Sequence, residues 1–203
     1  MALVTVIIPF KIDRGWLKDA IASVPMCVEL IQACGNGNWP QNFNKGLINA
    51  TGDYIKFLHE DDMLTPNCIK DSLAAFKATG ADFIHGNAFE LHEHFGTKTE
   101  WHPPIAEPTF ADLLHKNTIH STTLMYKREI FDKIGGFNED PKMYSFEEFE
   151  FNLRCLKAGF KIGYVDAFLA TYRRHPRQII RTVDTKTRQT YRNALVKQYK
   201  DDK

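Results

Sequence analysis

Residues 54–66 of the chain read YIKFLHEDDMLTP, a short apolar run that leads directly into four polar residues. The run is typical of a buried strand, and Asp61 and Asp62 follow its carboxyl end. Ligands of open α/β sheets bind beyond the carboxyl ends of the strands. Adjacent carboxylates there suit Mg²⁺ or Mn²⁺, because substrate phosphates complete the coordination. Taken alone, the acids are equally explained as charges that favour the start of the helix after Thr65 and Pro66.

Apolar strands and amphipathic helices alternate on both sides of this stretch. Strands are expected at residues 2–9, 28–33, 54–58, 82–91, 122–126 and 161–172. Helices are expected directly after Asp13, around residues 43–51, and at residues 66–79, 109–114, 128–136 and 145–160. This alternation predicts an α/β fold with a mostly parallel central sheet and helices on both faces.

The composition bounds the class of protein. The 203 residues, 43% of them hydrophobic, are enough to bury one sizeable core. A formal net charge of +1 provides no global attraction to nucleic acid or acidic membranes. The first apolar run is too short to span a bilayer and lacks the features of a signal peptide. The four cysteines lie far apart, without metal-binding spacing, as in a cytoplasmic protein with reduced thiols. We therefore expect a cytoplasmic protein with no membrane span and no nucleic-acid partner.

The alternation predicts a single domain over residues 1–178, because no repeat, low-complexity tract or linker interrupts it. Residues 179–203 belong to the one markedly basic segment of the chain, which begins after Tyr172. We expect residues 179–203 to form a helical tail that either packs on the domain or leads to a further domain. The functional alternative for the basic segment is contact with phosphate or an acceptor near Arg173 and Arg177.

Several segments resemble the inverting GT-A glycosyltransferases of family 2. FLHEDDMLTP resembles the family motif FLDADDxxxP, with Asp61, Asp62 and Pro66 at matching positions. Further family-like segments occur in the family's order: VTVIIPF with its helix, NKGLINATGDYIKFL, HSTTLMYKREIFDKIGGFNE, FEEFEFNLRCLKAGFKI and YRRHP. Each is weakly specific, but their common order over residues 3–178 favours the GT-A fold and implies the reaction. The compact architecture also resembles a glycosyltransferase domain of chlorella viruses, which would place the chain in a host cytoplasm.

The resemblance implies a UDP-linked nucleotide-sugar donor, with Mn²⁺ or Mg²⁺ and a glycan or glycoprotein acceptor. By this resemblance Asp62 would ligate the ion, and His175 would complete the metal or pyrophosphate site. Asp61 would contact the ribose or the metal. The other residues implied in nucleotide-sugar binding are Pro9, Phe10, Lys11, Asn44, Lys45, Arg173 and Arg177.

An acid at the start of a helix is implied as the base that deprotonates the acceptor hydroxyl. Glu148 holds the matching position, and Glu147 is the fallback one residue away. Alternatively, Ser145 and Glu148 fit the S-x-x-E capping box, in which the glutamate only stabilises the start of its own helix. Trp101 and His102, in a predicted loop over the crevice, are candidates for stacking on an acceptor sugar, with plain loop packing as the alternative.

Three departures from the family pattern bear on the mechanism. His59 stands where the motif has its first aspartate, and Glu148 stands where the base is usually aspartate. QACGNGNWPQN replaces the family's VVDDGSxD segment. The longer side chain of glutamate shifts the carboxylate by about 1.5 Å, which leaves inversion and retention both open. A non-catalytic sugar-binding module is the alternative from another class, but it would need neither a metal pair nor an acid at the helix start.

Overall fold

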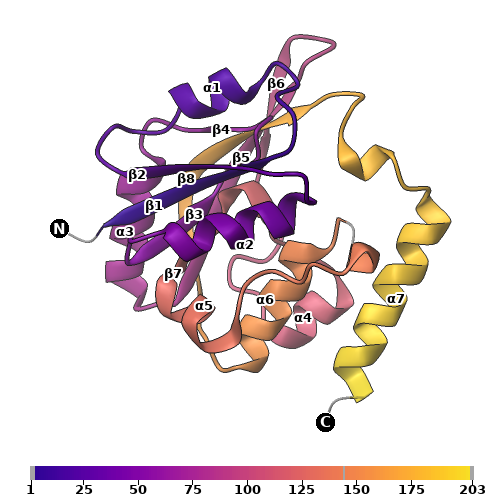
Figure 1. Ribbon diagram of the computed structural model, residues 1–203. Helices are drawn as coiled ribbons and strands as arrows, with labels where there is room; N and C mark the ends of the chain where they lie inside the picture. Colours follow the sequence, from indigo (N-terminus) through magenta and orange to yellow (C-terminus); the bar gives the residue numbers. More distant parts are fainter. Residues whose placement is uncertain (1–2, 144, 202–203) are drawn as a thin grey trace.

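The computed structural model describes residues 3–143 and 145–201 (Figure 1). Its strands are β1 (Val4–Phe10), β2 (Glu29–Cys34), β3 (Tyr54–Phe57), β4 (Met63–Leu64), β5 (Phe83–His92), β6 (Thr97–Trp101), β7 (Met125–Lys127) and β8 (Ile162–Arg174). Its α-helices are α1 (Leu17–Ala22), α2 (Trp39–Asn49), α3 (Cys68–Thr79), α4 (Phe110–His115), α5 (Arg128–Ile134), α6 (Glu147–Lys157) and α7 (Thr185–Asp201). Short 3₁₀ turns are η1 (Ser121–Thr123), η2 (Pro141–Met143) and η3 (Ile179–Arg181). None of the helices described is long and apolar enough to cross a membrane.

The strands form one mixed sheet in the order β2-β1-β3-β7-β5-β8-β4, with β6 paired to β5. Parallel pairings join β1 to β2 and β3, and a long parallel pairing joins β5 to β8. β7 runs antiparallel to β3 and to β5, so it joins the two parallel halves. The expected α/β fold is therefore confirmed, and its mostly parallel sheet includes antiparallel β4, β6 and β7.

Helices cover both faces of the sheet (Figure 1) because neighbouring residues of a strand point to opposite sides. Ile7, Phe57 and Tyr126 point to one side, where they share a core with side chains of α2, α5 and α6. Ile8 and Ile84 point to the other side, where they pack with side chains of α1 and α3. Burial on both faces explains the nearly continuous apolar runs of β1 and β3.

The two-residue strand β4 brings distant parts of the chain together. It pairs antiparallel with β8, with Met63 opposite Thr171 and Leu64 opposite Ala170. The loop between β3 and β4, residues 58–62, therefore lies beside the end of β8 rather than projecting into solvent. The sequence analysis did not predict β4, because two residues are too few to show a period.

Two helix starts and one loop differ from expectation. α1 does not begin directly after Asp13, because the Asp13 carboxylate accepts a hydrogen bond (2.7 Å) from the N–H of Gly15, whose φ is 100°. α6 begins without a side-chain cap, and its predicted capping box is not formed. Ser145 has a φ of 67°, which takes it out of the extended conformation of an N-cap. Trp101 ends β6 instead of lying in a loop.

The basic tail contains α7, which packs against α4 and α6. Leu195 and Tyr199 are buried in the same core as side chains from those helices. The Tyr199 hydroxyl donates a hydrogen bond to Glu150 Oε1 (2.8 Å). The guanidinium of Arg192 donates to the carbonyl of His115 (2.6 Å) at the end of α4. A boundary at residue 178 remains a prediction.

Gly46 lies where α2 packs closely against β1 and β2. A Cβ at this position would lie 2.8 Å from Ile7 Cγ2 and 3.0 Å from Ala33 Cβ, and both residues are buried. We expect Gly46→Val to lower the free energy of unfolding by about 2–3 kcal/mol more than Lys45→Val, because Lys45 is exposed on the same helix. Chemical denaturation of both variants measures the difference. Equal losses would show that α2 moves away from the sheet without cost.

Candidate active site

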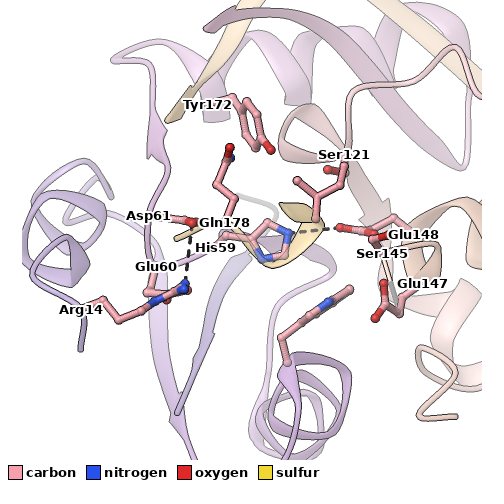
Figure 2. A pocket seen from close by; sticks show the side chains of 12 residues that line it. Arg14, His59, Glu60, Asp61, Ser121, Ser145, Glu147, Glu148, Tyr172 and Gln178 are labelled. Atoms are coloured by element: carbon pink, nitrogen blue, oxygen red, sulfur yellow. Dashed lines mark hydrogen bonds and ion pairs between the residues drawn. The ribbon is translucent and has the colours of Figure 1, made fainter. Parts of the chain in front are cut away.

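A pocket, here named the central pocket, opens at the carboxyl ends of the strands. It is lined by Arg14, Trp39, His59, Glu60, Asp61, Ser121, Ser145, Glu147, Glu148, Tyr172, Gln178 and Ile180. Figure 2 shows Arg14, Glu60 and Asp61 on one side and the two glutamates of α6 on the other, with His59 between them. The pocket therefore joins the loop after β3, the start of α6 and the end of β8.

A second pocket, here named the side pocket, adjoins the central pocket and shares Arg14, Trp39 and Glu60 with it. Its lining also includes Pro9, Phe10, Lys11, Ile12, Asn36, Gly37, Asn38 and Asn42. The sequence analysis predicted a nucleotide pocket at residues 9–11, and the structure places these residues together in this lining. The segment that replaces the family's VVDDGSxD contributes Asn36, Gly37, Asn38, Trp39 and Asn42 to the same lining.

Asn42 fixes the shape of the side pocket. Its buried amide donates hydrogen bonds to the carbonyls of Phe10 (2.9 Å) and Gly35 (3.0 Å), so it ties the end of β1 to the loop after β2. A Cβ at Gly35 would lie 2.4 Å from the Asn42 side chain, so this position has room only for glycine. The loop can close tightly around the amide for this reason.

Asp61 lines the central pocket and forms a close pair with His175, which is buried and is not part of the lining. His175 Nε2 lies 2.9 Å from Asp61 Oδ2. The imidazole is buried and packs on the Trp16 ring, with the ring centroids 3.9 Å apart. Its Nδ1 accepts a hydrogen bond from the backbone N–H of Arg177 (3.1 Å). Both contacts fix the ring so that Nε2 is the nitrogen that faces Asp61.

The charge of Asp61 is stabilised by its neighbours. Burial raises the pKa of its carboxyl, but the hydrogen bond from His175 and the charges of His59, His175 and Arg14 together lower it. Arg14 also binds Glu60, with its Nε 2.8 Å from Glu60 Oε1. Asp61 is therefore an ionised carboxylate on the pocket wall.

Asp62 is turned away from the central pocket and is buried. Its Oδ1 accepts a hydrogen bond from the backbone N–H of Arg173 (2.9 Å) in β8. Burial and the neighbouring charge of Asp61 raise its pKa to about 7. The prediction that Asp62 is a metal ligand is untested, but this geometry connects it to the sheet and not to the pocket.

His59 and Glu148, the two substituted positions of the family pattern, contact each other. His59 Nε2 lies 3.1 Å from Glu148 Oε1 (Figure 2). Burial lowers the pKa of His59, but the hydrogen bond and charge of Glu148, with the charges of both aspartates, raise it to about 9. His59 is therefore protonated at neutral pH and pairs with the predicted base.

Glu147, the fallback base, lies in a different environment from Glu148. Its side chain also lines the central pocket, but the residue is only 3% exposed. Burial, and next the charge of Glu148, raise its pKa to about 8. Glu147 is therefore protonated at neutral pH, whereas a base must be ionised before it can accept a proton.

Other predicted site residues are held outside these two pockets. The Arg173 guanidinium binds Asp19 (2.9 Å) and the carbonyl of Asp61 (3.0 Å). Arg177 packs over Trp16, with its guanidinium carbon 4.2 Å from the ring centroid. Both arginines therefore brace the loops around the central pocket without lining it.

The predicted residues of α2 and β6 also lie outside the two pockets. Asn44 ties α2 to Phe137 by donating to its carbonyl (2.9 Å) and accepting from its N–H (3.0 Å), while Lys45 is exposed. The Trp101 ring contacts His120, with the ring centroids 5.1 Å apart. His120 in turn contacts Tyr172, which lines the central pocket, so one side chain separates Trp101 from the lining. The imidazole of His102 faces solvent next to Glu100.

The sequence analysis did not single out several lining residues, among them Arg14, Trp39, Tyr172 and Gln178. Tyr172 could have been predicted as a lining residue, because it is the first residue of the family-like YRRHP segment. Gln178 is placed by a hydrogen bond from its amide to the carbonyl of Arg173 (2.8 Å), which no sequence pattern indicates. Arg14 is placed by a loop whose course the sequence does not predict, and Trp39 begins α2, which starts before the helix expected around residues 43–51.

The strand order, the acidic loop after β3 and the adjoining pockets define a GT-A glycosyltransferase fold. Residues 16–135 match the model "Glycosyl transferase family 2", so the chain belongs to that family, as its sequence motifs predicted. A curated relative, the "Uncharacterized glycosyltransferase YwdF" of Bacillus subtilis (strain 168), is 30% identical over 122 residues. The match covers 56% of this chain and 42% of the relative, so the chain spans less than half of that protein.

The fold is also similar to solved structures of S. aureus TarS. TarS 1–349 in complex with UDP-GlcNAc matches with a TM-score of 0.69 and 14% identity, over 90% of this chain and 62% of that one. TarS 1–349 in complex with UDP matches with a TM-score of 0.65, over 97% of this chain and 70% of that one. At this identity the similarity shows the fold.

Protonated Glu147 makes stability depend on pH. Its pKa of about 8 exceeds the ordinary value of 4.5, so the folded state binds a proton that the unfolded state releases between these values. Stability from this group is full below about pH 4.5 and is lost as the pH rises towards 8. We expect Glu147→Gln to raise the melting temperature relative to wild type more at pH 8 than at pH 5. Thermal unfolding at both values measures this shift.

Glu129→Gln is the matched control, because Glu129 is exposed on α5. It should change the melting temperature by the same small amount at both pH values. A Glu147→Gln shift that is equal at pH 5 and pH 8 would show that Glu147 is ionised in the folded protein.

Proposed function

We propose that the chain transfers a sugar from a UDP-linked donor to a hydroxyl group of a glycan, with inversion at the transferred carbon. The observation that carries this proposal is the arrangement of the central pocket, where Asp61 and Glu148 lie on different sides (Figure 2). A donor phosphate and a base are needed on opposite sides of the reacting carbon in such a displacement. Membership of glycosyl transferase family 2 supports the reaction class.

The donor extends from the side pocket into the central pocket. The side pocket offers the ring of Trp39 and the backbone around Phe10 and Lys11 to a base and ribose. Arg14 lies at the junction of the two pockets, where its positive charge faces the diphosphate. The TarS structures with UDP-GlcNAc and UDP support a UDP-linked donor on this fold.

A divalent ion would be held by the Asp61 carboxylate rather than by Asp62, while His175, whose Nδ1 accepts from the N–H of Arg177, donates its Nε2 proton to Asp61 and orients it. Among the described residues no group of three or more His, Cys, Asp or Glu side chains is placed to hold a metal, so donor phosphates must supply further ligands. Carboxylate and phosphate oxygens suit both Mn²⁺ and Mg²⁺. When bound, the ion neutralises charge on the departing nucleoside diphosphate. Asp62 holds the loop in place through β8.

Glu148 is the base. Its carboxylate takes the proton of the acceptor hydroxyl while the hydroxyl oxygen bonds to the anomeric carbon. The bond from that carbon to the donor phosphate breaks, and its electron pair leaves with UDP. Protonated His59 fixes the orientation of the Glu148 carboxylate by a hydrogen bond to one of its oxygens. The second oxygen is left for the acceptor.

Donor binding tests the assignment of Asp61 as the metal ligand. We expect UDP to bind more tightly with Mn²⁺ than without it. We expect Asp61→Asn to remove most of this gain, and His175→Ala to remove part of it because Asp61 loses the hydrogen bond that orients it. Asp132→Asn, an exposed position on α5, is the charge-matched control and should bind UDP like wild type. Calorimetric titration of UDP, with GDP and CMP for comparison, measures the affinities. Equal UDP affinity with and without Mn²⁺ would refute the metal assignment.

Transfer activity tests the base. We expect Glu148→Gln to lower kcat by about 10²–10⁴-fold while UDP still binds, because only the proton acceptor is lost. Glu147→Gln should have a much smaller effect, since Glu147 is already protonated. UDP release measures the rate, and NMR of the product gives its anomeric configuration. A product with retained configuration, or normal transfer by Glu148→Gln, would contradict the role of Glu148.

A further inference from the structure

A third pocket lies on the other side of Glu148 from the Asp61–His175 pair. It shares Ser121, Ser145, Glu148 and Ile180 with the central pocket. Its outer wall includes Arg188 and Arg192 of α7. Glu148 therefore belongs to the boundary between the two pockets and is accessible from both.

The two arginines give this pocket an uncompensated positive charge. Arg188 Nε donates a hydrogen bond to Ser145 Oγ (3.2 Å), and Arg192 Nη2 donates to the carbonyl of His115 (2.6 Å). Neither forms an ion pair with a described carboxylate, and Glu148 pairs with His59 instead. A guanidinium has five N–H donors, so Arg188 in particular retains donors for a ligand.

We propose that the third pocket binds the acceptor and selects a sugar that carries a negatively charged group, a carboxylate or a phosphate, which Arg188 binds. This inference rests on the proposed function, because Glu148 must be the base for the acceptor hydroxyl to be placed beside it. The guanidinium of Arg188 matches the geometry of both anions, since its planar fork donates two parallel hydrogen bonds. Arg192 adds charge beside it while it caps α4.

The outer wall of the third pocket belongs to α7. This helix is fixed to the domain by buried Leu195 and Tyr199, so its arginines are held at the pocket by packing. Selection of the acceptor therefore depends on α7.

Binding to the UDP–Mn²⁺-loaded protein tests the inference. The probes are methyl glucoside, methyl glucuronide and the 6-phosphate of methyl glucoside, which share one ring and differ in charge. We expect at least one charged probe to bind about tenfold or more tightly than the neutral one, with a preference that falls at high ionic strength. The glucuronide and the phosphate distinguish the two kinds of anion. Equal binding of all three probes, or no binding, would overturn the inference.

Variants of Arg188 identify the residue responsible. Arg188→Gln should abolish the preference, and Arg188→Lys should keep part of it because the charge remains. Lys197→Gln, at an exposed position of the same helix, is the control and should leave the preference unchanged. If both Arg188 variants keep the full preference, or weaken all probes equally, Arg188 only supports Ser145 and the inference fails. Melting temperatures of the variants establish that they are folded.

The two proposals fail differently. Absence of UDP binding by the wild-type chain would count against the proposed function. Normal UDP binding without any preference for a charged probe would count against the acceptor selection alone.

Discussion

The site depends on one buried hydrogen bond, from the backbone amide of Arg173 to the carboxylate of Asp62. It joins the loop after β3 to the end of β8, next to the two-residue pairing of β4 with β8. The neighbouring Asp61 is thereby held against His175, which follows directly after β8. An unpaired buried carboxylate would be costly, so the amide and the loop stabilise each other. The geometry of the pocket wall follows from this contact.

The sequence predicted the strands with apolar runs, the helices on both faces and the position of the acidic loop, because each depends on local pattern. It did not predict which of two adjacent aspartates faces the pocket. That choice depends on the pairing of Met63 with Thr171, more than one hundred residues away in the chain. Pro9, Phe10 and Lys11, predicted to line a nucleotide pocket, do lie together in the side pocket, because they lie at the end of a strong strand pattern. Arg173 lies outside both pockets, because the direction of its side chain depends on the same long-range register.

Two departures from the family pattern, considered separately, look like losses of function. In the structure they are one contact, in which His59 replaces an acid and pairs with the longer acid at 148. The exchange also changes the charge of the pocket, because His59 is protonated at pH 7 where the family motif has an acid. Fewer negative charges then face the proposed site of the diphosphate. The substitutions at 59 and 148 are therefore best understood as a matched pair.

The order of these elements along the chain has a consequence for synthesis. Every residue that lines the central and side pockets precedes α7, whose arginines complete the third pocket. A growing polypeptide leaves the ribosome at about 5–20 residues per second, amino terminus first. The central and side pockets, the proposed donor site, can thus assemble on the nascent chain before the outer wall of the third pocket exists. On the two proposals above, a nascent chain would bind the nucleotide sugar before it could select an acceptor.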